Sequence, residues 1–295
     1  MSDNRKPALS RRALLGGAGA AAALASFGLP GTASADPGGP DPESHGRHHL
    51  RFAGFNIHHG ADVDDVVDLE RIATIIAALD VDVIGLQEVD RFWQRSQYVD
   101  QPAWLADRLG MHAVFGANLL PGPEFPGDRD REYGTAILSR WPIVDWDNTY
   151  LPRFDEHEQR GLLRARIKAP GTAVTFLNTH LQHDNDPERE AQASAIVELA
   201  GRRPRNTVLV GDFNTEPDTV AHGIVSRAFT DTWSRIGDGP GYTYQAPDPT
   251  VRIDYLWVGN GPGFAPVSMQ TVTDDPTASD HLPVVGDFRV RRGRH

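Results

Sequence analysis

The chain has 295 residues, with 29 Lys or Arg, 40 Asp or Glu and no cysteine. Hydrophobic residues make up 39% of it, which is enough for a sizeable core and excludes a low-complexity disordered protein. The lack of cysteine excludes disulfides and gives no support to a structural zinc site.

The first 35 residues have the pattern of an export signal. Arg11-Arg12 precedes an alanine-rich apolar run that ends at Ala33-Ser34-Ala35, a small-residue cleavage pattern. Glycines and Pro30 interrupt this run, and no later stretch is apolar for long enough to span a bilayer, so we expect no transmembrane segment. We therefore expect twin-arginine export and a soluble mature protein that is secreted or extracytoplasmic.

The mature chain is strongly acidic. Removing residues 1–35 takes away four basic groups and one acidic group, which leaves 25 basic against 39 acidic groups and a net charge of −14. A protein with this net charge does not gather polyanions through its overall field. We therefore expect no strong electrostatic binding of nucleic acid.

Residues 36–48 are rich in Pro, Gly and polar residues and contain nothing to bury, which predicts a flexible leader. No internal repeat and no second linker interrupts the segment from 49 to 291. This segment is therefore predicted to form one domain.

Hydrophobic patterns along this domain predict alternating strands and helices. We expect a strand over 50–57, a helix that begins after the N-cap Asp68, and a strand over 82–87 buried on both faces. A helix near 102–110 and a Pro/Gly-rich loop over 118–131 follow. The remaining expected elements are strands near 134–139, 143–150, 160–167 and 173–179, a helix over 187–200, a strand over 207–211, a helix over 218–228 and strands near 253–258, 267–272 and 283–290. Because helices alternate with strands, and several strands follow one another directly, we predict an α/β fold of two packed mixed sheets with helices outside, a four-layer α/β/β/α sandwich.

Polar residues gather at the ends of five expected strands. Ligands in layered α/β folds collect at such strand ends. A single Asn or Asp there is usually a turn former or a helix N-cap, but turns do not require His and Glu. Five segments together therefore indicate one polar site: Asn56, Gln87-Glu88, Asn178-Thr179-His180, Gly211-Asp212-Phe213-Asn214 and Ser279-Asp280-His281.

Seven short motifs extend this pattern over nearly the whole domain. They are Phe55-Asn56-Ile57, Leu86-Gln87-Glu88-Val89, Tyr133-Gly134-Thr135-Ala136-Ile137-Leu138-Ser139, Asn178-Thr179-His180-Leu181, Gly211-Asp212-Phe213-Asn214, Arg252-Ile253-Asp254-Tyr255 and Ser279-Asp280-His281-Leu282-Pro283. In this order they resemble the endonuclease/exonuclease/phosphatase superfamily, over residues 50–290. That superfamily includes pancreatic-type deoxyribonuclease, abasic-site endonucleases, inositol polyphosphate phosphatases and bacterial sphingomyelinases. The resemblance implies the sandwich fold and metal-dependent hydrolysis of a phosphoester by an exported bacterial member.

Hydrolysis of a phosphoester needs a cation for developing charge, an in-line water and a group that orients that water. Mg²⁺ prefers carboxylate and carbonyl oxygens. By the resemblance, Glu88 is the principal ligand of Mg²⁺, or of Mn²⁺ in its place, and Asn56 and Asp280 complete the metal side. Asp212 would orient or deprotonate the water, and Asn214 would hold the water or a phosphate oxygen.

The resemblance also implies roles for two histidines. Asp254 would pair with His281, which orients the imidazole and raises its pKa. Glu132 would face His180, as a glutamate does in deoxyribonuclease-like members, although His180 could instead be a core histidine. Surface or supporting roles are expected for four others: His58, His59, His157 and His183.

These expectations predict an exported Mg²⁺-dependent phosphoester hydrolase. We expect a phosphodiesterase in which water makes a metal-assisted in-line attack on phosphorus. A secreted deoxyribonuclease is one alternative, against which the acidic charge counts. A sphingomyelinase-like phospholipid phosphodiesterase is another, with Leu119-Leu120-Pro121 and Phe125 as candidate apolar contacts. A catalytically silent binding module is the third, but such loss leaves gaps in the constellation, and every expected position is filled. We expect a monomer that acts on a phosphoester of undetermined class.

Overall fold

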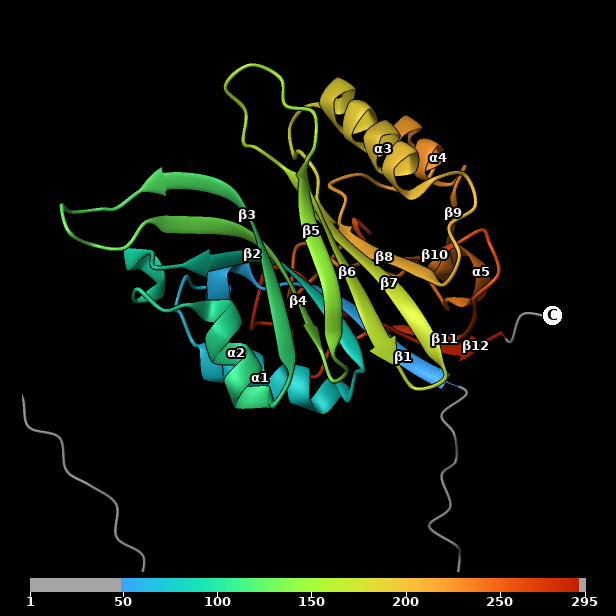
Figure 1. The fold of residues 1–295 in the computed structure, drawn as a ribbon, viewed down its shortest axis with the longest axis horizontal. Helices are drawn as coiled ribbons and strands as arrows, with labels where there is room; N and C mark the ends of the chain where they lie inside the picture. The colour runs from blue at the N-terminus through green and yellow to red at the C-terminus, as the bar shows by residue number, and fades with distance from the viewer. Residues whose placement is uncertain (1–48, 292–295) are drawn as a thin grey trace, which may run out of the picture. The chain divides into compact units, whose positions relative to one another are not determined.

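The computed structural model describes residues 49–291 (Figure 1). The expected signal over 1–35 and the expected leader over 36–48 lie outside the described residues and stay predictions. None of the helices between residues 49 and 291 combines the length and the hydropathy of a membrane-spanning segment.

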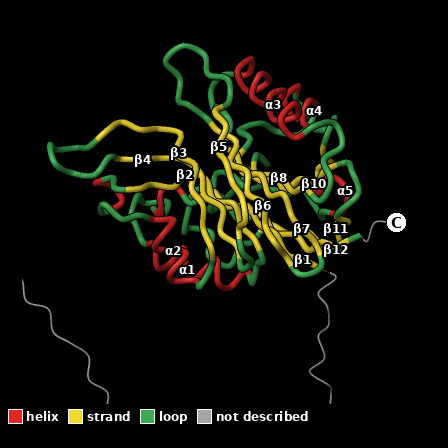
Figure 2. The backbone as a smooth tube through the Cα atoms, in the orientation of Figure 1, coloured by secondary structure: helices red, strands yellow, loops and turns green. Residues whose placement is uncertain are grey.

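Two six-stranded mixed sheets pack face to face in this domain (Figures 1 and 2). In spatial order, the first sheet contains β11 (Phe264–Thr271), β12 (Val284–Val290), β1 (His49–Asn56), β2 (Val83–Arg91), β4 (Arg131–Ser139) and β3 (His112–Gly122). The second contains β5 (Ile143–Tyr150), β6 (Gly161–Ala169), β7 (Thr172–His180), β8 (Thr207–Asp212), β10 (Asp254–Gly259) and β9 (Phe229–Asp231). One pair in each sheet is parallel, β1 with β2 and β7 with β8.

Helices cover the outer faces of both sheets and complete the predicted four-layer sandwich, which is confirmed. On the first sheet lie α1 (Leu69–Leu79) and α2 (Gln101–Leu109); on the second lie α3 (Asp186–Ala200) and α4 (Val220–Val225), and the short α5 (Thr232–Ile236) follows β9. As expected, α1 begins after the N-cap Asp68, whose side chain accepts a hydrogen bond of 2.9 Å from the backbone of Arg71.

The core between the sheets is aromatic at its centre. Phe52 of β1 packs against Phe176 of β7 across the two sheets, with ring centroids 5.8 Å apart. The rings of Phe264 and Phe288 each lie 5.4 Å from that of Phe52. All four side chains are buried, and such pairs add to the stability gained from burying their area.

A buried amide joins the sheets near the ends of their central strands. Asn178 donates hydrogen bonds to the carbonyls of Leu86 (2.9 Å) and Ala136 (2.8 Å). Its Oδ1 accepts a third hydrogen bond of 2.6 Å from Nε2 of Gln87. A Cβ at Gly85 would lie 2.8 Å from the Asn178 side chain, so glycine is required at that position. Gln87 and Asn178 therefore link the two sheets to each other and are not part of the polar site.

The expected loop over 118–131 is partly strand. β3 extends to Gly122 and pairs with β4 from Arg131, so the two form a long hairpin (Figure 1). Register shifts between Ala117 and Leu119, and again before Gly122, interrupt the pairing. Such bulges break the two-residue alternation by which a strand is recognised in a sequence.

Candidate active site

The polar strand ends meet at one end of the sandwich. Because β1 and β2 are parallel, as are β7 and β8, the carboxyl ends of each pair lie at the same edge. In the register of these pairs, Asn56 lies beside Gln87, and His180 lies beside Asp212. The segment before β12 joins this end through Ser279, whose hydroxyl donates to the Asn56 carbonyl at 2.8 Å.

Asp212 is at the centre of the site. Its Oδ2 lies 3.5 Å from Nε2 of His180 and 3.6 Å from Nε2 of His281. The same oxygen accepts a hydrogen bond of 3.1 Å from Asn56, and Oδ1 accepts one of 2.9 Å from the backbone of Asn214. Burial raises the pKa of Asp212 to about 7, although the positive charge of His281 opposes the rise. A carboxylate with this pKa can accept a proton near neutral pH.

Asn214 is held beside Asp212 by its backbone. Its φ is 48°, in the left-handed region that Asn tolerates better than most residues. Its side-chain Nδ2 donates to the carbonyl of Leu181 at 3.1 Å. This contact uses the amide nitrogen and leaves the amide oxygen as the atom that could meet a water molecule.

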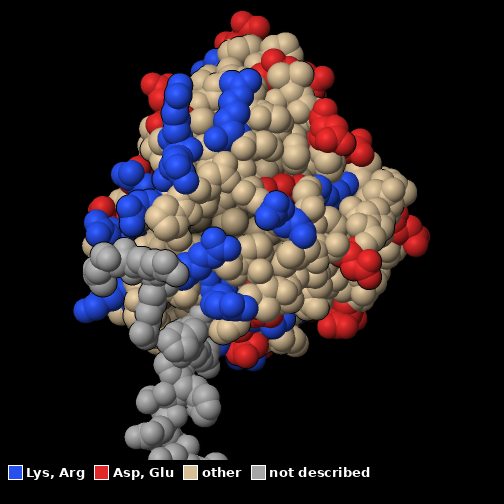
Figure 3. All heavy atoms as spheres, turned by 90° about the vertical axis from the view of Figure 1, so that its right-hand side faces the viewer, with Lys and Arg blue, Asp and Glu red and all other residues tan. Residues whose placement is uncertain are grey.

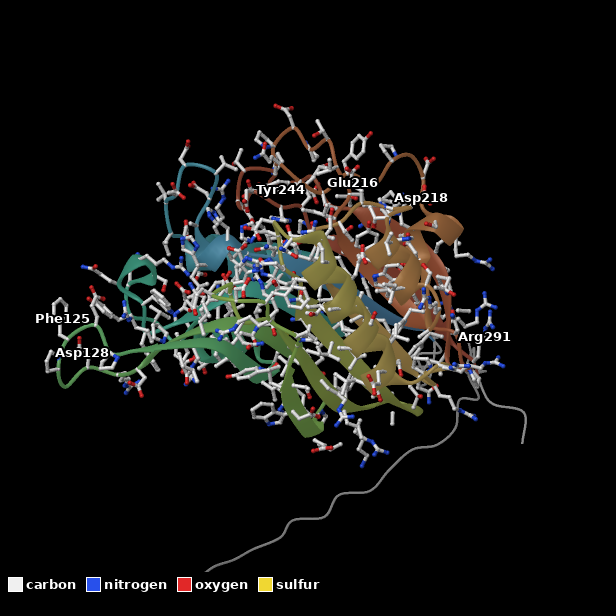
Figure 4. All side chains as sticks on the ribbon, turned by 90° about the horizontal axis from the view of Figure 1, so that it is seen from above. Phe125, Asp128, Glu216, Asp218, Tyr244 and Arg291 are labelled. Carbon is white, nitrogen blue, oxygen red and sulfur yellow. The ribbon has the colours of Figure 1, made fainter. Side chains whose placement is uncertain are left out.

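His281 forms the expected pair with Asp254. Nδ1 of His281 lies 2.8 Å from Oδ2 of Asp254, and both side chains are buried. Burial alone would disfavour the imidazolium, but the carboxylates of Asp254 and Asp212 outweigh it and raise the pKa of His281 to about 10. Tyr244, labelled in Figure 4, stacks on this imidazole with ring centroids 4.7 Å apart. His281 is therefore a fixed positive charge at neutral pH.

His180 has a different partner from the one expected. Its Nδ1 lies 3.0 Å from Nη1 of Arg160, which is buried and lies 2.6 Å from Oε1 of Glu158. Since a guanidinium can only donate, Nδ1 accepts and the ring proton is on Nε2, the atom that faces Asp212. Burial, and then the positive charge of Arg160, hold the pKa of His180 well below its usual range. His180 is thus a neutral donor.

The predicted pair of Glu132 with His180 is wrong. Glu132 forms an ion pair with Arg91 instead. The cause is the register of the first sheet, in which Glu132 of β4 lies directly opposite Arg91 of β2. Opposed side chains on neighbouring strands are close enough to pair, so the carboxylate is taken up within its own sheet.

Glu88 lies where β2 is interrupted. A register shift between Leu86 and Val89, together with a φ of 58° at Glu88, breaks the pairing with β4. Oε1 of Glu88 accepts a hydrogen bond of 3.0 Å from Nδ2 of Asn56, the amide that also donates to Asp212. The bulge therefore places the Glu88 carboxylate at the end of β1, against the central part of the site.

Asp280 reaches the same strand end through its neighbour. The Ser279 hydroxyl, which is bonded to the Asn56 carbonyl, lies 3.4 Å from Oδ1 of Asp280. Between residues 49 and 291, no hydrogen bond joins Asp280 directly to Glu88. Of the three expected metal ligands, Asn56 and Glu88 are in contact and Asp280 is joined to them through Ser279.

Two functional residues were not among those predicted. Arg160 sets the tautomer of His180, and Tyr244 covers one face of His281. Arg160 stands just before β6, where an arginine next to a glycine gives no sign of its buried partner. Tyr244 lies in the irregular segment before β10, so no strand pattern indicates its position.

Comparison with known proteins decides the family. Residues 53–281 match the model of the Endonuclease/Exonuclease/phosphatase family, which is most of the chain. The chain belongs to this family. Members of the endonuclease/exonuclease/phosphatase family are metal-dependent phosphoester hydrolases.

Several known proteins are similar to the chain. The uncharacterized protein YbhP of Escherichia coli is 25% identical over 237 residues, which cover 75% of this chain and 88% of YbhP. A crystal structure of an endonuclease/exonuclease/phosphatase from Beutenbergia cavernae is 28% identical, with a TM-score of 0.68 over 83% of this chain and 72% of that one. A mannosyl-6-phosphatase of Bacteroides thetaiotaomicron is 21% identical, with a TM-score of 0.64 over 81% of this chain and 99% of that one. The last likeness shows the shared fold.

The residues of the site fit the divalent ion that the family uses. Glu88 and Asp280 form no salt bridge within the described residues, although Arg95 lies near enough to interact with the first and His281 with the second. Carboxylate and amide oxygens are the donors that a hard cation prefers. Glu88 and Asp280 would hold such an ion at the end of β1, next to the Asp212 centre. The amide of Asn56 directs its Nδ2 at Glu88 and Asp212 and its Oδ1 at the backbone of His58, so it would have to turn for its oxygen to join them.

Proposed function

We propose that the protein is an exported Mg²⁺-dependent phosphoester hydrolase that acts on phosphodiesters. The observation that carries the proposal is the position of Asp212. Its Oδ2 lies within 3.6 Å of Nε2 of both His180 and His281, and Asn56 links it to the metal side at Glu88. The proton acceptor Asp212, the neutral donor His180 and the imidazolium of His281 therefore lie close together.

Each residue then has a chemical role in the attack of water on phosphorus. The divalent ion, when bound, supplies positive charge for the phosphoryl oxygens. Asp212 accepts the proton of the attacking water, which its pKa of about 7 allows. As the water oxygen bonds to phosphorus, the ester P–O bond opposite it breaks, and the leaving alkoxide takes a proton from solvent water. His281, as an imidazolium, stabilises the charge that develops on the phosphoryl group, and His180 donates Nε2–H to a phosphoryl oxygen. Because the base must be unprotonated, the rate is expected to rise as the pH increases through about 7.

The charge of the centre does not by itself choose between a diester and a monoester. Four carboxylates, Glu88, Asp212, Asp254 and Asp280, lie near the positive side chains Arg160 and His281, and a bound divalent ion would balance the remaining two negative charges. Substrates of both classes are therefore compared in the assay below.

A dedicated deoxyribonuclease has less support than the sequence suggested. The Glu132–His180 pair, which favoured it, is not formed. On the face shown in Figure 3, Lys and Arg lie mainly on one half and Asp and Glu mainly on the other. The net charge of −14 of the mature chain also counts against a dedicated nuclease, because an acidic protein does not gather a polyanion through its overall field.

One exposed apolar residue supports a phospholipid phosphodiesterase as the second candidate function. Phe125 is 56% exposed and, with Asp128, marks the tip of the β3–β4 hairpin, far from Tyr244 (Figure 4). Exposed apolar residues on a projecting hairpin are a plausible contact for a lipid surface. Sphingomyelin therefore belongs among the substrates to test.

A substrate screen with matched variants tests the proposal. Purified protein is assayed on bis(p-nitrophenyl) phosphate, p-nitrophenyl phosphate, plasmid DNA and sphingomyelin, with Mg²⁺ and with EDTA. We expect Mg²⁺-dependent hydrolysis of a diester, and a loss of roughly 100-fold or more in Glu88→Gln, partly restored by high Mg²⁺. Glu198→Gln, at an exposed position of α3, is the control and should be fully active. Full activity in EDTA would contradict the proposal.

A further inference from the structure

Two histidines, His58 and His59, lie beside Glu88. Side-chain ligand atoms of His58, His59 and Glu88 lie within 4.8 Å of one another. The two imidazole rings meet edge to face, with centroids 4.5 Å apart. Two imidazoles and a carboxylate are a set of donors that binds metal ions in many proteins.

The backbone holds this cluster in an unusual conformation. His58, His59 and Glu88 all have positive φ, of 45°, 46° and 58°. A residue other than glycine is strained at such a φ, and the surrounding structure must hold it in place. Gln101 holds His59 in place, because Nε2 of Gln101 donates a hydrogen bond of 2.6 Å to the carbonyl of His59. The Asn56 side chain does so for His58, whose backbone N donates to Oδ1 at 3.1 Å.

The imidazoles have nitrogen atoms available for a ligand. Nδ1 of His58 is buried and has no hydrogen-bond partner among the described residues, while its Nε2 is 3.9 Å from Asp65. The ring of His59 contacts the ring of His58 and forms no hydrogen bond within the described residues.

The surrounding charges permit a cation. Arg95 is the positive group nearest to the cluster, and it donates two hydrogen bonds of 2.8 Å to Asp90, which neutralises much of its charge. The carboxylate of Asp65, 3.9 Å from Nε2 of His58, adds a second negative charge to that of Glu88 within the cluster. An added cation would therefore meet two carboxylates and one compensated guanidinium.

We propose that His58 and His59, with Glu88, form a site for a divalent transition-metal ion such as Zn²⁺ or Mn²⁺. Mg²⁺ prefers oxygen donors, whereas imidazole nitrogen favours the transition metals. Three protein ligands leave a coordination position open for water or a phosphoryl oxygen. The inference rests on the proposed function, because it shares Glu88 with the metal side of that centre and adds nitrogen ligands to it.

A binding titration tests the site without measuring hydrolysis. The full chain, freed of metal, is titrated with Co²⁺ by visible absorption and with Mg²⁺ by calorimetry. We expect Co²⁺ to bind at least roughly 100-fold more tightly than Mg²⁺, with the spectrum of an imidazole-ligated ion. Equal affinity of the unaltered chain for Co²⁺ and Mg²⁺ would overturn the proposal, whatever the variants do.

Variants identify the ligands. In the double variant His58→Asn/His59→Asn, asparagine tolerates the positive φ, so the loop should keep its fold, which thermal unfolding checks. We expect Co²⁺ affinity to fall at least roughly 100-fold and Mg²⁺ affinity to change by less than about threefold. His112→Asn, at an exposed position of β3, should leave both unchanged. Undiminished Co²⁺ binding, or a parallel loss of Mg²⁺ binding, would overturn the proposal.

The two proposals can fail separately. If Co²⁺ binds through the histidines while hydrolysis survives EDTA and Glu88→Gln, the site stands and the hydrolase assignment falls. If hydrolysis depends on Glu88 while Co²⁺ binding ignores both histidines, the hydrolase stands and the nitrogen-rich site falls.

Discussion

His180 and His281 face one carboxylate oxygen of Asp212 but differ in protonation. The second nitrogen of each ring explains the difference, because Nδ1 of His180 meets Arg160 and Nδ1 of His281 meets Asp254. A guanidinium excludes a proton from the Nδ1 that it faces, and a carboxylate favours one there. Two residues of the same type therefore supply different chemistry to one centre.

An NMR titration of imidazole signals in the metal-free protein tests this difference. With a pKa raised to about 10, His281 should remain charged through neutral pH and lose its proton only as the pH rises past about 10. His180, whose pKa is lowered, should remain neutral at neutral pH. In Asp254→Asn the pKa of His281 should fall, because its closest carboxylate is gone. Similar titration of the two rings would contradict the assignment.

At the scale of elements, the register of β2 with β4 decides which residues act together. It places Glu132 opposite Arg91, whereas Arg160, just before β6, lies against His180. Double-mutant cycles on kcat should therefore show coupling of about 1 kcal/mol or more between Arg160→Gln and His180→Ala. Glu132→Gln and His180→Ala should add to within about 0.5 kcal/mol. Strong coupling in the second cycle would restore the deoxyribonuclease-like pair.

Local patterns explain which elements could be predicted. The N-cap at Asp68 and the strand over 143–150 follow from residue types within a few positions, and both are present in the structure. Strand-end motifs likewise indicated Asn56 and Asp212, because a motif is local. The partner of Glu132 depends on which residue lies opposite it in the sheet. The bulges of β3 break the two-residue alternation by which the end of that strand could have been predicted. Long-range register is the information that one sequence does not contain.

At the scale of the whole molecule, we propose that the twin arginines at the start of the chain direct export. Cell fractionation tests this with Arg11→Lys/Arg12→Lys, which should leave the protein in the cytoplasm. The control is Arg202→Lys/Arg203→Lys, an exposed pair in the folded domain, which should be exported normally. Unchanged export of the first variant would show that another route carries the protein.

The most direct test of the hydrolytic centre is the effect of Asp212→Asn on kcat/KM for a phosphodiester such as bis(p-nitrophenyl) phosphate. The substitution keeps the shape but removes the charge and one of the two acceptor oxygens, so either the hydrogen bond from Asn56 or the one from the backbone of Asn214 is lost together with the proton acceptor. Loss of a general base of this kind costs roughly 100- to 10,000-fold in rate. The account predicts a loss in that range with an unchanged melting temperature. A variant that is folded and retains wild-type kcat/KM would contradict it.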